Sequence, residues 1–571
     1  MFRKHQKHLQ SALMSDIDRL PQKHRQRLDG SWAGVFYREV FCRIDEEIFA
    51  GLYADVPSRP NVPVNVLVGL ETLKAGFGLS DEELYDAFTY DLQVRYALGY
   101  RDLGEGEFDL RTLYYFRARL SQYNREHEVN LIQQAFAQIT DQQLTAFQVR
   151  TGKQRMDSTQ IASNIMDLSR LQLAVEGVHR LARLLSEGER ERYAELLAPY
   201  LPGSAEHYAY RVKGQEETQR HLSLVGDVLH TLLGHLWERC HEEAAYQAVA
   251  RLFEENFVVA EETTRVRPNG ELHSGCLQSL DDLEASYRYK ANREYKGYVV
   301  NVAETCDPDN PVQLITYVQV APNNTADTDL LVEALPQLKA RTDVETLITD
   351  GAYGSPAGDH LLQELQVEQI PTGFTGRAPD PARLHLSDWE VAQDDQGVPS
   401  SATCPGGQTV CLTRTRRGYF SGRAEPARCA VCPFYTSGRC QARLGSRDAP
   451  FRIRFSLEEL RLAERRRAMA TRQADCKLRP AVEATMRSVK HPFPAGQLPL
   501  RGRFRVTCMM VCSALMVNTR RLAAYLNKAH KQESQAPQDQ ETAVSCSICR
   551  FFAAAATWLL RQLQRKPCFA C

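Results

Sequence analysis

A short apolar stretch that ends in an acid constrains this fold more than any other feature of the sequence. Val344, Leu347 and Ile348 give VETLITD the character of a buried strand, which stops at Asp350. A buried charge without a partner costs roughly several kcal/mol, so another charge or a metal ion must compensate this carboxylate. We therefore expect Asp350 to belong to a site at the end of a central strand.

A second acid, Asp157, lies in the stretch 147–160, which resembles a strand that we expect to end near Asp157. If the two strands are adjacent, Asp157 and Asp350 face each other and repel unless a divalent cation lies between them. Hard oxygen ligands favour Mg²⁺ or Mn²⁺, and two such ions about 3.5–4 Å apart suit phosphoryl transfer. The pair of acids therefore predicts a metal site.

A helix within residues 476–493 offers a third carboxylate for this site. Arg479, Glu483, Arg487 and Lys490 fall at helical spacing, so one acid shares a helix face with three bases. Such a face suits a metal ion beside a phosphate backbone. The alternative, which this window alone favours, is a surface helix stabilised by ion pairs.

The other patterns predict an α/β fold in several parts. A mixed sheet with helices on its faces would form a catalytic domain over 138–526, preceded by an all-α N-terminal domain over 1–137. A helical insertion, 161–282, follows the first strand, and a cysteine-rich insertion, 377–455, precedes the last long helices. Residues 527–571 would form a linker and a tail.

Charge and composition indicate an intracellular protein that meets a polyanion. The chain opens without a signal peptide, and its apolar run at 551–560 is too short to cross a bilayer, so a cytoplasmic location is expected. The net charge is only −1, yet basic segments occur at 413–423, 461–490 and 500–505. Their clustering favours nucleic acid as the partner.

The N-terminal pattern leaves two interpretations open. Three short helices over 63–125, the third carrying Arg117, fit a DNA reader of the helix-turn-helix type or an ordinary helical bundle. In the first case Arg117 contacts DNA.

Two groups of cysteines have spacings typical of zinc sites. Cys404, Cys429, Cys432 and Cys440 form a C-x2-C pair with two outlying cysteines, and a structural zinc ion or four free thiols would explain them. The tail contains a second group, Cys546, Cys549, Cys568 and Cys571. A predicted helix separates its two pairs and must double back to unite them.

The chain resembles the DDE transposases of bacterial insertion sequences, in the group with a Y-x2-R-x3-E-x6-K signature. Arg479, Glu483 and Lys490 match three of the four signature positions, and Cys476 stands at the tyrosine. The segments RMDST and LITDGAYGS resemble those that contain the first two acids of these transposases. The likeness covers roughly residues 20–526, including the helical N-terminal part.

This resemblance implies a function for the predicted site. It implies an RNase H-like core that holds two Mg²⁺ or Mn²⁺ ions on Asp157, Asp350 and Glu483, with Arg479 and Lys490 on DNA phosphates. The expected partner is double-stranded DNA, cleaved and joined by a homodimer in the bacterial cytoplasm, at the nucleoid. A plain metal-dependent nuclease and a domesticated DNA-binding protein are the alternatives.

Overall fold

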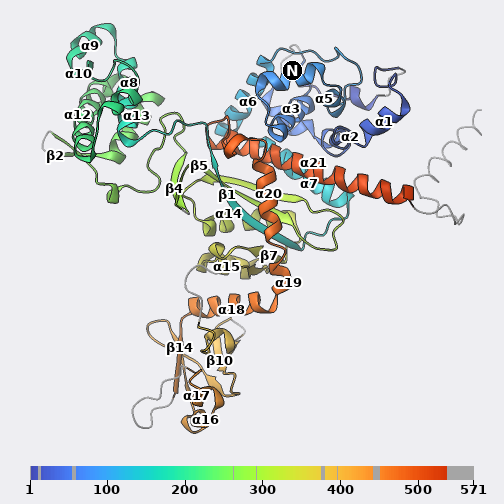
Figure 1. The fold of residues 1–571 in the computed structure, drawn as a ribbon, viewed down its shortest axis with the longest axis vertical. Coiled ribbons are helices and arrows are strands. Elements are labelled where there is room, and N and C mark those ends of the chain that lie inside the picture. The colour runs from blue at the N-terminus through green and yellow to red at the C-terminus, as the bar shows by residue number, and fades with distance from the viewer. Residues whose placement is uncertain are drawn as a thin grey trace, which may run out of the picture. The chain divides into compact units, whose positions relative to one another are not determined.

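The computed structural model describes residues 2–10, 14–54, 60–260, 263–290, 292–373, 380–394, 397–440 and 451–535. The chain forms two compact units, Met1–Ala523 and Ala524–Cys571, and the first contains the elements described below except the end of the last helix (Figure 1). The cysteine group predicted in the tail lies outside the described residues. Within the described ranges, no helix has the length and apolar character needed to cross a membrane.

The N-terminal region is helical, as the sequence predicts. Ser80 and Glu83 cap α4 reciprocally, which sets its first turn. Gly78 ends α3 in a left-handed conformation, and a Cβ there would lie 2.0 Å from the carbonyl oxygen of Pro492, so only glycine fits. The helices are α1 (Gln22–Asp29), α2 (Trp32–Glu39), α3 (Val64–Phe77), α4 (Asp81–Tyr90), α5 (Leu92–Ala97), α6 (Arg111–His127) and α7 (Leu131–Ala146).

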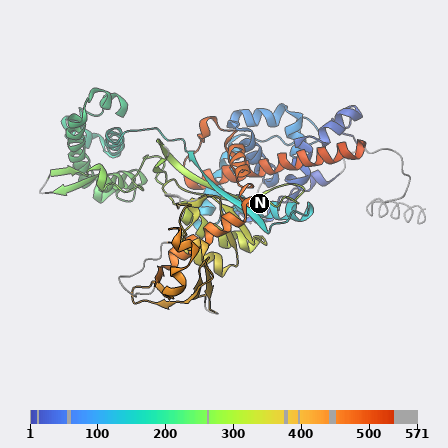
Figure 2. The ribbon, with the colours of Figure 1, turned by 60° about the horizontal axis from the view of Figure 1, so that its bottom comes forward.

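A six-stranded mixed sheet follows, in the order β4-β5-β1-β7-β8 with β6 also beside β5. The long strands β1 and β5 are antiparallel neighbours (Figure 2), whereas β7 is parallel to β1 and to β8. The predicted mixed sheet is therefore confirmed. Its strands are β1 (Lys153–Ala162), β4 (Ser286–Lys290), β5 (Arg293–Thr305), β6 (Ile315–Pro322), β7 (Thr346–Thr349) and β8 (Glu368–Pro371), and the helices α14 (Asp327–Arg341) and α15 (Pro356–Glu364) connect β6 to β7 and β7 to β8.

Between β1 and β4 the chain forms a helical insertion with its own apolar core. Leucines on facing sides of α8 and α12 fill this core, among them Leu181, Leu229 and Leu232. The elements are α8 (Arg170–Leu184), α9 (Glu187–Arg192), α10 (Ala194–Leu197), α11 (Ala205–Arg211), α12 (Gln215–Cys240), α13 (Ala244–Asn256), β2 (Phe257–Ala260) and β3 (Thr263–Val266).

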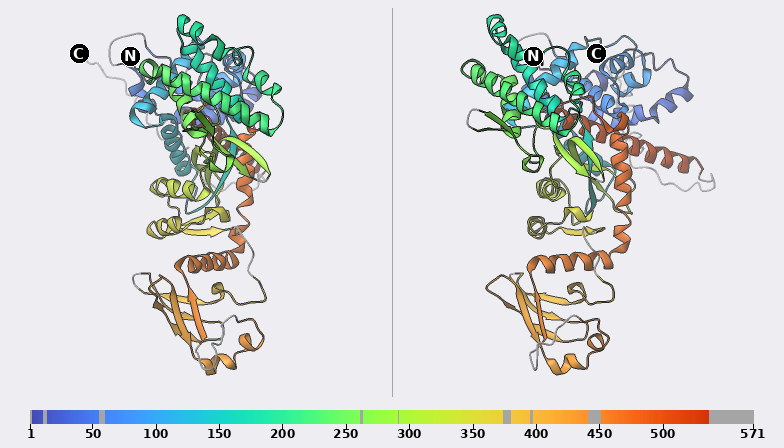
Figure 3. Two further views of the ribbon diagram at one scale, coloured as in Figure 1. Left: turned by 90° about the vertical axis from the view of Figure 1, so that its left-hand side faces the viewer. Right: turned by 60° about the vertical axis from the view of Figure 1, so that its left-hand side comes forward.

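A second insertion follows β8 and consists mainly of short strands. Phe420, Phe455 and Leu460 form a small core that joins these strands to α18. Figure 3 shows α18 between β8 and the insertion strands, and it contacts β8 directly. The elements are β9 (Glu390–Gln393), β10 (Pro399–Thr403), β11 (Thr409–Cys411), β12 (Thr413–Arg414), β13 (Phe420–Ala424), α16 (Pro426–Ala430), α17 (Pro433–Thr436), β14 (Phe451–Phe455) and α18 (Leu457–Thr471).

Three more helices, α19 (Gln473–Cys476), α20 (Pro480–Lys490) and α21 (Arg503–Gln535), complete the described chain. Pro480 occupies the first turn of α20, where its missing N–H costs no hydrogen bond. Val482, Met486 and Val489 recur at helical spacing and are buried, and α20 packs on β1. The opposite face of α20, with Glu483 and Arg487, remains exposed.

Candidate active site

The two predicted acids come together because β1 and β7 are parallel neighbours. Arg155 of β1 lies opposite Ile348 of β7. Asp157 lies two residues after Arg155, and Asp350 lies two residues after Ile348. Side chains two residues apart point to the same face of a sheet. Parallel pairing thus brings the two carboxylates to the same level, as the sequence argument requires.

The expectation that β1 ends near Asp157 is wrong. Strand β1 continues to Ala162, because β5 remains paired with it and Asp157 lies opposite Val302. Only the ladder with β7 stops, at Arg155. Asp157 therefore lies on a continuous strand at the point where its neighbour on one side ends. The polar residues Ser158 and Gln160 conceal the strand character of residues 158–162, which also contain the strand-favouring Thr159 and Ile161.

Asp350 lies in the turn after β7. Its carboxylate accepts a hydrogen bond of 2.6 Å from the backbone N–H of Ala352. Asp350 thereby caps the short 3-10 turn Gly351–Tyr353. The side chain is 43% exposed, whereas that of Asp157 is 13% exposed. The site therefore has one inner acid and one outer acid, and the outer acid faces solvent.

A single guanidinium lies within ion-pair distance of all three acids. Arg479 lies with Nη2 3.0 Å from Oδ2 of Asp157 and 3.6 Å from Oδ2 of Asp350, and its Nη1 lies 3.0 Å from Oε1 of Glu483. The third predicted carboxylate thus joins the first two through one cation. Glu483 is 60% exposed and reaches the cluster from α20.

The inner acid is electrostatically perturbed. Burial raises the pKa of Asp157, and the negative charge of Asp350 adds to this effect. The positive charge of Arg479 and the hydrogen bond from the Ser158 N–H act in the opposite direction. A cation on the solvent-facing side of Asp157 would stabilise its charged form, which is the property expected of a metal ligand.

Lys490 is held at the edge of the same cleft. Its ammonium donates hydrogen bonds of 3.0 Å to Oγ1 of Thr159 and 2.8 Å to the carbonyl oxygen of Gln160, and burial lowers the pKa of the amine. These bonds connect the last turn of α20 to β1. The contact of Lys490 with DNA phosphate remains a prediction.

The acids line an open cleft of about 490 Å³ together with several bases. Besides Arg479, Arg487 and Lys490, these are Lys290 and His491, which the sequence argument missed. His491 lies four positions after Arg487, so continuing the row of Glu483 and Arg487 by one helical turn indicates it. Lys290 ends β4 and carries no local signal, because only the pairing of β4 with β5 brings it here.

A buried ionic cluster fixes the position of α20. Glu304 of β5 is fully buried and accepts hydrogen bonds from Nε of Arg155 and Nη1 of Arg521, each at 2.7 Å. It also accepts from Oγ1 of Thr485 at 2.8 and 2.9 Å. Thr485 is two residues beyond Glu483, roughly on the opposite side of the helix. Anchoring Thr485 to the sheet therefore turns Glu483 toward the cleft.

Arg117 lies elsewhere, in an ion-pair network of the N-terminal region. Its Nε donates to Glu71 at 2.7 Å, and its two terminal nitrogens donate to Asp81 at 2.9 and 2.7 Å. Lys74 also pairs with Asp81. These bonds give Arg117 a structural role between α6, α3 and α4, and its predicted contact with DNA is untested.

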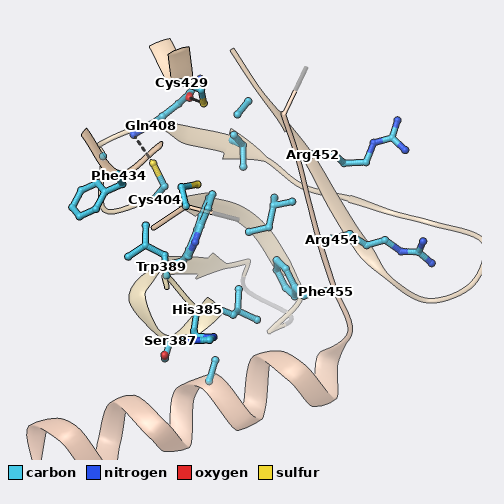
Figure 4. A pocket seen from close by; sticks show the side chains of 18 of the residues that line it. His385, Ser387, Trp389, Cys404, Gln408, Cys429, Phe434, Arg452, Arg454 and Phe455 are labelled. Carbon is cyan, nitrogen blue, oxygen red and sulfur yellow. Dashed lines mark hydrogen bonds between the residues drawn. The ribbon is translucent and has the colours of Figure 1, made fainter. Parts of the chain in front are cut away.

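Four of the cysteines in the second insertion, Cys404, Cys429, Cys432 and Cys440, line one cavity of about 510 Å³ (Figure 4). Gln408 lies between two of them: its backbone N–H points to Sγ of Cys404 at 3.4 Å, and its Oε1 accepts from Sγ of Cys429 at 3.2 Å. Burial raises the pKa of Cys429, and Cys404, Cys440 and Cys432 are near enough to add to this effect. The fold therefore brings together the four thiols whose spacing is typical of a zinc site.

Neither cluster has the spacing of a preformed metal site. Among the described residues, no three His, Cys, Asp or Glu side chains stand as they would around a metal ion. At the acid cluster the reason is visible, because the guanidinium of Arg479 lies among the carboxylates. The donor chemistry of Asp157, Asp350 and Glu483 fits Mg²⁺ or Mn²⁺, provided that Arg479 withdraws.

Comparison with known proteins adds one finding, which concerns the N-terminal helices. No curated protein and no solved structure matches the chain. A family model does match, over a region that begins before α1 and ends within α6 and that contains none of the three acids. Residues 18–119 match the transposase domain family DUF772, a domain typical of the transposases of insertion sequences.

Proposed function

We propose that this protein is a DDE transposase, which cleaves DNA at the ends of an insertion sequence and joins those ends to a target. The observation that carries the proposal is the convergence of Asp157, Asp350 and Glu483 on one guanidinium in an open cleft. The transposase domain over residues 18–119 supplies the biological context. Neither observation alone leads to this function.

The sheet supports an RNase H-like core. Three antiparallel strands, β6, β5 and β1, are followed in space by β7 and β8, which run parallel to β1. This order and these directions are what such a core requires, with the first acid on the central strand and the second after the adjacent parallel one.

The residues of the cleft take distinct roles in this proposal. When bound, Mg²⁺ or Mn²⁺ would supply Lewis-acid stabilisation and an activated attacking oxygen, held by Asp157, Asp350 and Glu483. Arg479 forms ion pairs with the three acids in this structure and moves to a DNA phosphate when they are ligated. Lys290 and Arg487 attract the phosphate backbone to the cleft. Two DNA ends must be held together, so we expect a homodimer on DNA.

The test is metal-dependent cleavage of a supercoiled plasmid that carries the DNA flanking the gene. The wild-type chain should nick this plasmid with Mg²⁺ or Mn²⁺. Asp157→Asn, Asp350→Asn and Glu483→Gln should each abolish nicking and retain DNA binding. Asp309→Asn is the matched control, since Asp309 is an exposed acid, 73% accessible, at a distant loop. Cleavage that persists in one acid variant would exclude that residue from the site.

The alternatives give different products. A plain nuclease would nick DNA but form no strand-transfer product with paired ends. A domesticated DNA-binding protein would bind the flanking DNA without metal-dependent nicking.

A further inference from the structure

Part of the cysteine-rich insertion, residues 401–440, is strongly basic although the chain as a whole is nearly neutral. Residues 401–440 contain six arginines and a single acid, Glu425, and β14 adds Arg452 and Arg454. The eight arginines of this segment and of β14 are Arg414, Arg416, Arg417, Arg423, Arg428, Arg439, Arg452 and Arg454. The whole protein has a net charge of −1, so this concentration of charge is local.

The strands place part of this charge on one exposed face. In the antiparallel pair β13–β14, Arg423 lies directly opposite Arg452, and Ser421 lies opposite Arg454. Phe420 and Phe455 alternate with these residues and are buried, whereas Arg423, Arg452 and Arg454 are exposed. Figure 4 shows the guanidinium groups of Arg452 and Arg454 extending away from the cysteines.

This arrangement is electrostatically unfavourable without a partner. Like charges directly opposite each other on adjacent strands destabilise a sheet. Of the eight arginines, Arg428 forms an ion pair, with Glu425. Among the described residues, no acid lies within ion-pair distance of Arg423, Arg452 or Arg454, although Arg454 lies 4.0 Å from the ring centre of Tyr419. Repulsion between Arg423 and Arg452 is a cost that an external anion would remove.

We infer that this arginine face, Arg423, Arg452 and Arg454 with Arg416 and Arg417 of the β12–β13 turn, binds the phosphate backbone of duplex DNA. The guanidinium of arginine can donate two parallel hydrogen bonds to phosphate oxygens. A row of arginines on a strand face fits an extended polyanion better than a small ligand. The choice of DNA rests on the proposed function. The contact carries no sequence information, because it reaches backbone and not bases.

The experiment compares the full-length chain with the double variant Arg423→Gln, Arg452→Gln, with a random-sequence duplex as the probe. Each lost phosphate contact should reduce the slope of log affinity against log salt by about 0.9, so the double variant should lose about 1.8. At about 0.1 M salt this corresponds to roughly 60-fold weaker binding. The melting midpoint should not fall, because the substitutions remove a repulsion and no buried contact.

The control, Arg183→Gln with Arg220→Gln, removes the same charge from exposed sites of the helical insertion and should leave the slope unchanged. An unchanged slope in the Arg423 and Arg452 variant, with normal melting, would overturn the inference. Tighter wild-type binding to single-stranded RNA or anionic vesicles than to duplex DNA would also overturn it. Plasmid nicking by the wild-type chain is scored separately, so failure of this surface is distinguishable from failure of the proposed function.

Discussion

Glu304 provides the sharpest test of how the site is held together. Its carboxylate is fully buried and satisfies two guanidiniums and the hydroxyl of Thr485. Glu304→Gln keeps the volume but removes the charge, so Arg155, which is 8% exposed, and Arg521, which is 24% exposed, lose their counter-ion. Removing one partner from a buried pair costs about 3–5 kcal/mol. We expect a loss of this size in the free energy of unfolding.

Urea denaturation followed by far-ultraviolet circular dichroism measures this loss. The control is Asp309→Ala, which breaks the exposed pair between Asp309 and Arg150 and should cost no more than about 1 kcal/mol. Hydrogen exchange should also accelerate in α20, because Thr485 anchors that helix to Glu304. If Glu304→Gln costs no more than the control, the cluster does not fix α20 and the reasoning fails.

Three further predictions concern separate parts of the chain. Purified protein should contain zinc, and Cys429→Ser with Cys432→Ser should lower the metal content by about one equivalent in mass spectrometry; unchanged zinc would contradict this. Lys490→Ala should reduce the slope of log DNA affinity against log salt by about one unit. An unchanged slope with a lower melting midpoint would mean that Lys490 only holds α20 to β1, through Thr159 and Gln160. Burial lowers the pKa of His8 from 6.5 to about 4. In the pH window between these two values the unfolded chain therefore binds more protons than the folded chain. The melting midpoint should therefore fall as pH drops through the window, and His8→Phe should weaken that dependence; an equal dependence in both proteins would refute it.

The three acids could be recognised in the sequence as site residues because each lies in a short local pattern. A strand that ends at Asp350 and a helix with Glu483 on its polar face are visible within short windows. Their meeting also required β1 to pair with β7, which was a condition of the prediction and which the fold supplies. The same reasoning placed four cysteines together, since a C-x2-C pair and its outlying partners span fewer than forty residues.

Other features depend on contacts far apart in the chain and could not be predicted. Arg479 lies 322 positions from Asp157, and only the packing of α20 on β1 reveals that it pairs with Asp157 and Asp350 as well as with Glu483 on its own helix. Arg117 looked like a free base in its own window, but its partners Glu71 and Asp81 are 46 and 36 positions away. Lys290 reaches the cleft through the register of β4 with β5. The spacing of residues indicates which side chains share a helix face, but not which other residues pack against that face.

Binding of Mn²⁺ tests the central claim, that Asp157, Asp350 and Glu483 form one metal site, most directly. Titration of the full-length protein with Mn²⁺, followed by electron paramagnetic resonance, should show two ions per chain, as a two-metal site requires. Asp157→Asn combined with Asp350→Asn should remove both ions, whereas the exposed control Asp309→Asn should retain them. If the double variant binds Mn²⁺ with the wild-type stoichiometry, the three carboxylates do not form the metal site and the proposed chemistry has no basis.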